Sequence, residues 1–306
     1  MIKRFLTVMI MMLLLASFSV SAEDKFRIVT TTSDMQNLVQ AVAGTLADVT
    51  AIASPAQDQE EFQPRPTDIL RLKNAKMVVR VGLDYDLWLD RLLQEAGNPD
   101  LLPGGRGYID ASKGIALLEI RSVSFGPSIG HNHGAGNPHY WLDPENARII
   151  TASILEGLLK LDVNHAQIYE KNRTVFLSRL THEINGWTGR LARFRGVPII
   201  AYHNSWPYFA RRFRLNIIDY IEPKVDVPPS TAHLVELLTE MQTQHVRVII
   251  KAPFEPTRTP GLLAGKTGAK VLELAPSVGV IAGKDTYFSM MEYNVTQLVQ
   301  AFSRAD

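Results

Sequence analysis

The feature that most constrains this chain is an alternation of short apolar segments with amphipathic ones, which occurs twice. In the first half, the segments with the pattern of buried strands are 26–30, 49–54 and 77–82. The second half repeats the pattern with strands at 197–201, 217–221, 246–250 and 270–274. Helical patterns, such as that over 88–96, separate these strands, with Thr32 or Ser33 and Thr67 as candidate helix N-caps. That order is typical of parallel sheets covered by helices on both faces. We therefore predict an α/β fold with two lobes, each a mostly parallel sheet with helices on both faces.

One long helix is predicted between the two halves, over residues 164–194. Its apolar residues recur at spacings of three, four and eight: Ile168, Phe176, Leu180, Ile184, Trp187 and Leu191. A helix of this length measures ~45 Å at 1.5 Å per residue, enough to run along a small domain and reach a second one. We expect a rigid linking helix between an N-terminal lobe, 23–163, and a C-terminal lobe, 195–306, with a cleft between the lobes.

The N-terminus has the plan of a signal peptide. Lys3 and Arg4 precede an apolar stretch over 5–20, and small residues lead to Ala22. We expect residues 1–22 to be removed by cleavage after Ala22. The chain has no cysteine, so we expect no lipid anchor and a protein free in the periplasm. The formal net charge is +1 with no basic stripe, which argues against a nucleic-acid partner.

Three residues that can bind a metal ion lie in irregular segments, two of them just after predicted strands. They are Glu60, His139 and His203. Open α/β sheets bind ligands beyond the carboxyl ends of their strands, so these side chains can meet there. Imidazole nitrogen with carboxylate oxygen suits a first-row divalent ion, and two histidines favour zinc over magnesium or calcium. A lone histidine near aromatic residues is more often structural, so spacing alone does not decide the role of His203.

A loop over residues 126–138 carries two further histidines. His131 and His133 form a His-x-His sequence in a stretch without periodicity. Such a pair can collect metal ions without forming the main site, or it can be a solvated polar loop. We keep His133 as a candidate ligand.

Six segments resemble the metal-binding solute receptors of ABC importers, the zinc and manganese cluster known as cluster A-I. In the family's order they are 58–70, 75–88, 136–144 (GNPHYWLDP), 202–210 (YHNSWPYFA), 221–224 (IEPK) and 267–270 (TGAK). The resemblance implies two lobes on a rigid linking helix, a metal ion buried between them, and delivery of that ion to a membrane permease with its ATPase.

Carried over position by position, the resemblance makes His139 and His203 the second and third ligands. Glu60 stands where the first ligand is usually histidine, and the fourth position, usually an acid, falls on Ala275. Glu222 is a candidate for the missing ligand, because it follows the predicted strand 217–221. The carboxylate at position 60 should make manganese or ferrous iron more competitive with zinc.

The sequence therefore predicts a periplasmic, monomeric substrate-binding component of an ABC importer that carries zinc, with manganese or ferrous iron as alternatives. The competing interpretation is a zinc-dependent hydrolase that uses the same interlobe site, since catalytic zinc also has three protein ligands and one open position. Glu61 is the nearby candidate for its general base. The chain contains no HExxH motif to support it.

Overall fold

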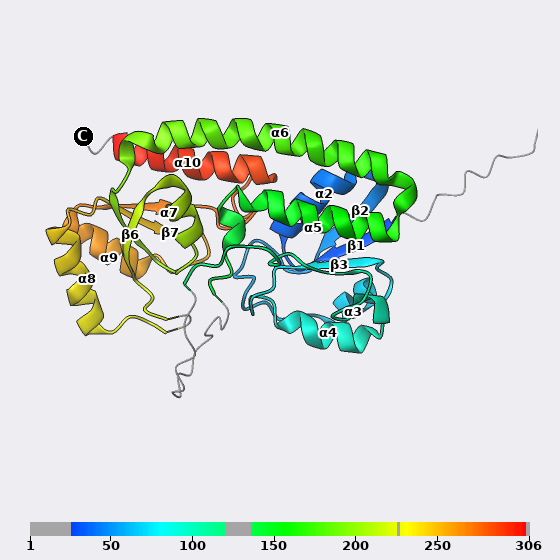
Figure 1. Ribbon diagram of the computed structural model, residues 1–306. Helices are drawn as coiled ribbons and strands as arrows, with labels where there is room; N and C mark the ends of the chain where they lie inside the picture. Colours follow the sequence, from blue (N-terminus) through cyan, green and yellow to red (C-terminus); the bar gives the residue numbers. More distant parts are fainter. Residues whose placement is uncertain (1–25, 120–135, 225–226, 304–306) are drawn as a thin grey trace, which may run out of the picture.

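The computed structural model describes residues 26–119, 136–224 and 227–303, and within them it contains two parallel sheets of four strands (Figure 1). The strand order is β2-β1-β3-β4 in the first sheet and β6-β5-β7-β8 in the second, so the two halves repeat one topology. The predicted fold class is confirmed. Residues 1–22, His131 and His133 lie outside the described residues, and the lobe boundaries stay predictions.

The first sheet consists of β1 (Phe26–Thr30), β2 (Ala47–Ala51), β3 (Met77–Arg80) and β4 (Tyr108–Asp110). Consecutive side chains of a strand point to opposite faces, and each face has its own core. Ile28 packs with α2 (Ser33–Ala43) and α5 (Asn146–Leu161), whereas Val29 packs with α3 (Pro66–Lys73) and α4 (Trp88–Ala96). The sheet is therefore buried on both faces, as its continuous apolar strands require.

The second sheet consists of β5 (Pro198–Ala201), β6 (Asn216–Tyr220), β7 (Val248–Lys251) and β8 (Lys270–Glu273). Ile200 and Ile249 face α8 (Thr231–Thr243) and α9 (Arg258–Thr267). Ile199 and Ile250 face the core that contains α7 (Pro207–Phe213) and α10 (Tyr287–Ser303). This core is continuous with that of the first lobe, so apolar packing holds the two lobes together.

The linking helix α6 (Ala166–Leu191) runs along one side of both lobes, with α10 beneath it (Figure 1). It is shorter than predicted because 3₁₀ turns, Val163–His165 and Ala192–Phe194, replace its ends. The rings of Phe176 and Phe288 lie 5.2 Å apart, and Trp187 donates a hydrogen bond to Glu292. Five of the six predicted face residues are buried, but Ile168 is 45% exposed, because Tyr169 occupies the buried position of the first turn.

Two helix starts test the predicted caps. Thr32 caps α2 as expected, since its hydroxyl accepts a hydrogen bond from Met35 N at 3.3 Å. Thr67 does not cap α3. That helix begins at Pro66, whose fixed φ suits the first helical position, and Arg65 N donates to the Asp68 carboxylate at 2.8 Å instead. Across the described residues, no helix is long and apolar enough to cross a membrane.

Candidate metal centre

Three of the predicted ligands meet at the carboxyl ends of the strands, between the lobes. Glu60 lies in the turn after β2, His139 lies between β4 and α5, and His203 comes two residues after β5. One ligand atom from each lies within 4.8 Å of the others, and the two imidazole rings are 5.6 Å apart. Both histidines are buried and Glu60 is partly buried. The first lobe supplies two of these groups and the second lobe supplies one.

The turn that carries Glu60 is fixed from both sides. The Asp58 carboxylate accepts a hydrogen bond from Glu60 N at 2.9 Å, which is the local geometry of an Asx turn. The indole of Trp88 donates to the carbonyl of Gln59 at 3.2 Å. The backbone at position 60 is therefore held by its own turn and by the start of α4.

His139 lies in an aromatic cage. Tyr85 is edge-on to the imidazole with ring centroids 5.5 Å apart, and the Trp141 ring lies 5.3 Å away. The Trp141 indole donates to the carbonyl of Pro276 at 2.8 Å, so the cage is tied to the segment after β8. The side chain of Asn137 also reaches His139, at both its backbone N–H and its ring.

Glu222 contacts His203 and is not part of the group of three. Glu222 lies just after β6, and its Oε2 is 2.5 Å from Nδ1 of His203. The other ring nitrogen of His203, Nε2, is therefore the one that an ion can reach. Burial by itself lowers the pKa of His203. The hydrogen bond to Glu222 and the charges of Glu60 and Glu222 outweigh burial and raise the pKa to about 9. A metal ion must therefore displace a proton from this ring at neutral pH.

Glu255 lies near His203 and is not among the residues that the sequence predicted. It comes shortly after the carboxyl end of β7, and the same kind of position had identified Glu60 and His203 as candidates. Its place after a strand could therefore have identified Glu255 as well. Its carboxylate accepts a hydrogen bond from Ala252 N at 2.6 Å. Burial raises its pKa to about 7, while the nearby charge of His203 acts to lower it and that of Asp58 to raise it. The centre is thus rich in carboxylates.

Position 275 supplies no metal ligand. Ala275 is fully buried, and its backbone N–H and C=O both bond to the side-chain amide of Asn294, at 2.7 and 2.8 Å. The methyl side chain has no donor atom. The resemblance predicted an acid at this position in the family, whereas Ala275 of this chain packs in the core.

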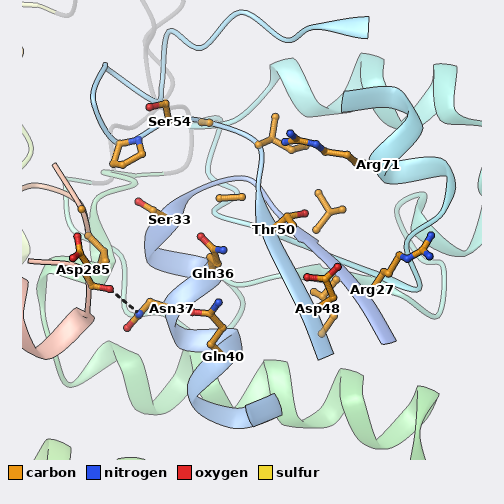
Figure 2. A pocket seen from close by; sticks show the side chains of 18 of the residues that line it. Arg27, Ser33, Gln36, Asn37, Gln40, Asp48, Thr50, Ser54, Arg71 and Asp285 are labelled. Atoms are coloured by element: carbon orange, nitrogen blue, oxygen red, sulfur yellow. Dashed lines mark hydrogen bonds between the residues drawn. The ribbon is translucent and has the colours of Figure 1, made fainter. Parts of the chain in front are cut away.

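A cavity of about 340 Å³ adjoins the centre, and a larger one lies elsewhere. The smaller is lined by Glu60, Glu61, Asp84 and Tyr85 among others, so its carboxylates give it a negative potential that favours cations. The larger, of about 860 Å³, runs along the edge strand β2 between α2 and α3 and contains none of the three candidate ligands (Figure 2). We place the candidate metal site at the histidine-containing centre because, among the described residues, it is the group of three or more possible ligands whose donor atoms converge.

Two α/β lobes joined by one long helix, with two imidazoles and a carboxylate converging between them, have the architecture of a bilobed solute receptor with a candidate metal site between its lobes. The comparison with protein families makes this more specific. The family model described as "Zinc-uptake complex component A periplasmic" matches residues 28–301, and the chain belongs to this family. The resemblance expected from the sequence is confirmed.

Individual relatives are distant but cover nearly the whole chain. The iron-binding protein YfeA of Yersinia pestis is 23% identical over 92% of this chain and 87% of its own length. The manganese ABC transporter substrate-binding lipoprotein PsaA of Streptococcus pneumoniae is 23% identical over 94% and 92%. A crystal structure of ZnuA superposes with a TM-score of 0.77 at 23% identity, over 91% of this chain and 99% of that one, which supports the fold.

These findings bear on the competing interpretations. The family consists of periplasmic solute-binding components of metal importers and not of enzymes, so the hydrolase alternative has no support. Relatives are named for zinc, manganese or iron, and their names do not select one metal for this chain.

Proposed function

We propose that this protein binds a divalent transition-metal ion at Glu60, His139 and His203 and delivers it to the permease of an ABC importer, which is driven by its ATPase. The observation that carries the proposal is the convergence of these three donor groups within 4.8 Å from two lobes. Membership of a periplasmic metal-uptake family supports a periplasmic location for this protein and an importer as its partner. We propose that the protein acts as a monomer.

Zinc is the ion that the donor set favours most. Two imidazoles and one carboxylate form a common zinc set, with the fourth position left to water or another ligand. Manganese and ferrous iron are the alternatives, because the Glu60 carboxylate is a hard donor and relatives are named for these metals. We propose that Glu222 orients His203 through Nδ1 and is not itself the fourth ligand, a role that carboxylates often have behind metal-bound histidines.

The division of ligands between lobes provides a route for release. His203 belongs to the second lobe, whereas Glu60 and His139 belong to the first. A small rigid-body opening would separate His203 from the other two donors at once. The ion would then keep only two protein ligands and could leave for the permease.

The experiment is metal analysis of tag-free protein, followed by titration of the metal-free form with zinc, manganese and ferrous iron. We expect one tight site, with zinc preferred. His139→Ala and His203→Ala should each reduce zinc affinity by more than the roughly 10- to 100-fold typical of removing an outer partner. His182→Ala, at an exposed position of α6, is the matched control and should bind as wild type does. Equal affinity in all four proteins would refute the assigned ligands.

A further inference from the structure

Asn137 touches the centre although it has no place in the predicted ligand set. Its side chain is 3% exposed. On one side, Oδ1 accepts a hydrogen bond from His139 N at 3.0 Å and lies 3.2 Å from Nδ1 of the same residue. On the other side, Nδ2 donates to the carbonyl of Asn204 at 2.9 Å and to the Glu119 carboxylate at 3.2 Å.

These partners fix which way the amide faces. A backbone carbonyl and a carboxylate only accept hydrogen bonds, so the NH₂ group of Asn137 must face Asn204 and Glu119. Its oxygen must then face His139. An acceptor at that point requires the proton of the neutral imidazole to be on Nδ1, which leaves the Nε2 lone pair for a metal ion. At His203, too, Nδ1 carries a proton toward an acceptor, the Glu222 carboxylate.

The same amide also joins the lobes beside the ligands. Asn204 follows His203 directly and belongs to the second lobe. The backbone of Asn137 is held from that lobe as well, because the buried hydroxyl of Tyr208 donates to its carbonyl at 3.0 Å and accepts from Leu118 N at 3.1 Å. An opening that separates His203 from His139 must therefore break the bond between Asn137 and Asn204.

We propose that Asn137 is a positioning residue with two functions: it sets the metal-binding tautomer of His139 through Oδ1, and it holds the lobes closed around the ion through Nδ2. Only the second function, closing the lobes around an ion, rests on the proposed function. The first does not, because the tautomer of His139 can be measured in the metal-free protein.

The first test reads the tautomer directly. Protein labelled with ¹⁵N-histidine is studied without metal by two-bond ¹H–¹⁵N correlation spectra, and His139 is assigned by comparison with His139→Ala. We expect Nδ1–H in the wild type and a mixture of tautomers in Asn137→Ala. A wild-type ring protonated at Nε2, or no change in Asn137→Ala, would overturn the first half of the proposal.

The second test measures zinc affinity and zinc dissociation by stopped-flow transfer to a chelator. Asn137→Ala should bind roughly 10- to 100-fold more weakly. Asn137→Asp, which loses the donor to Asn204 but keeps an oxygen facing His139, should release zinc faster. Asn172→Ala removes a comparable hydrogen bond, from the side-chain amide of Asn172 to the carbonyl of Val42, away from the three candidate ligands. This variant should bind and release zinc as the wild type does. Equal dissociation rates in the Asn137 and Asn172 variants would overturn the second half, whereas a wild type that binds no metal would refute the proposed function and leave the tautomer result intact.

Discussion

Zinc binding should depend on pH well above the range of an ordinary histidine. The pKa of His203 is raised from 6.5 to about 9, chiefly by Glu222 against the opposing effect of burial. At pH 7 the metal-free ring is therefore protonated, and binding must release that proton. One released proton makes the apparent dissociation constant fall about tenfold per pH unit. An unperturbed histidine would confine this dependence to pH values below about 6.5.

The perturbation that isolates this effect is Glu222→Gln. Glutamine keeps an oxygen that can accept from Nδ1 of His203 but removes the charge that stabilises the imidazolium. The rise from 6.5 to about 9 corresponds to about 3 kcal/mol at 1.36 kcal/mol per pKa unit, and much of it should disappear in the variant. Burial still lowers the pKa and the charges of Glu60 and Glu255 still raise it, so the pKa of His203 should fall toward its ordinary value of 6.5. The affinity of the variant should level off between pH 7 and 8.5, where that of the wild type still increases.

The assay is competition with a chromophoric chelator at pH 6, 7, 8 and 8.5, with the chelator's own protonation taken into account. Glu236→Gln, which removes an exposed acid on α8, controls for net charge. We expect it to follow the wild-type slope. A wild type with constant affinity between pH 7 and 8, or a Glu222→Gln variant with an unchanged slope, would refute the reasoning.

Two further predictions concern stability. Without metal, the folded protein binds a proton at His203 more tightly than the unfolded chain does, which adds to the free energy of unfolding. This addition is present in full below pH 6.5 and is lost as pH rises through about 9. Urea unfolding of metal-free protein should show a decrease in the free energy of unfolding of about 2 kcal/mol from pH 7 to 9, and a smaller one in Glu222→Gln. Equal decreases in both proteins would contradict this. Arg80→Met should cost about 3–5 kcal/mol, because it leaves the buried Asp86 carboxylate without its cation. Thermal unfolding tests this against Arg91→Met, whose exposed ion pair should matter little, and equal losses would contradict it.

Local sequence patterns predicted most of the secondary structure. The helix Trp88–Ala96 and the strand Phe26–Thr30 begin and end where their apolar periodicity does. Such patterns record which side of an element is buried, and neighbouring residues are enough to read them. The errors at Thr67 and Ile168 lie at helix ends, where caps and neighbouring segments decide the outcome.

The candidate site was predicted less completely. Glu60, His139 and His203 could be singled out because each lies beyond a strand or in a loop of the right chemistry, and the family resemblance ranked them above the other acids and histidines. Glu255 was missed, and nothing in the sequence assigned a role to Asn137.

What the sequence determined by itself is therefore the alternation of strands and helices, the long linking helix and the residues able to bind a metal ion. Only the tertiary structure decided that Glu60, His139 and His203 meet within 4.8 Å, and that Glu222 faces Nδ1 of His203. The reason is physical. Periodicity and residue chemistry are properties of short segments, whereas a metal centre depends on the order of strands in two sheets and on how two lobes pack across a shared core.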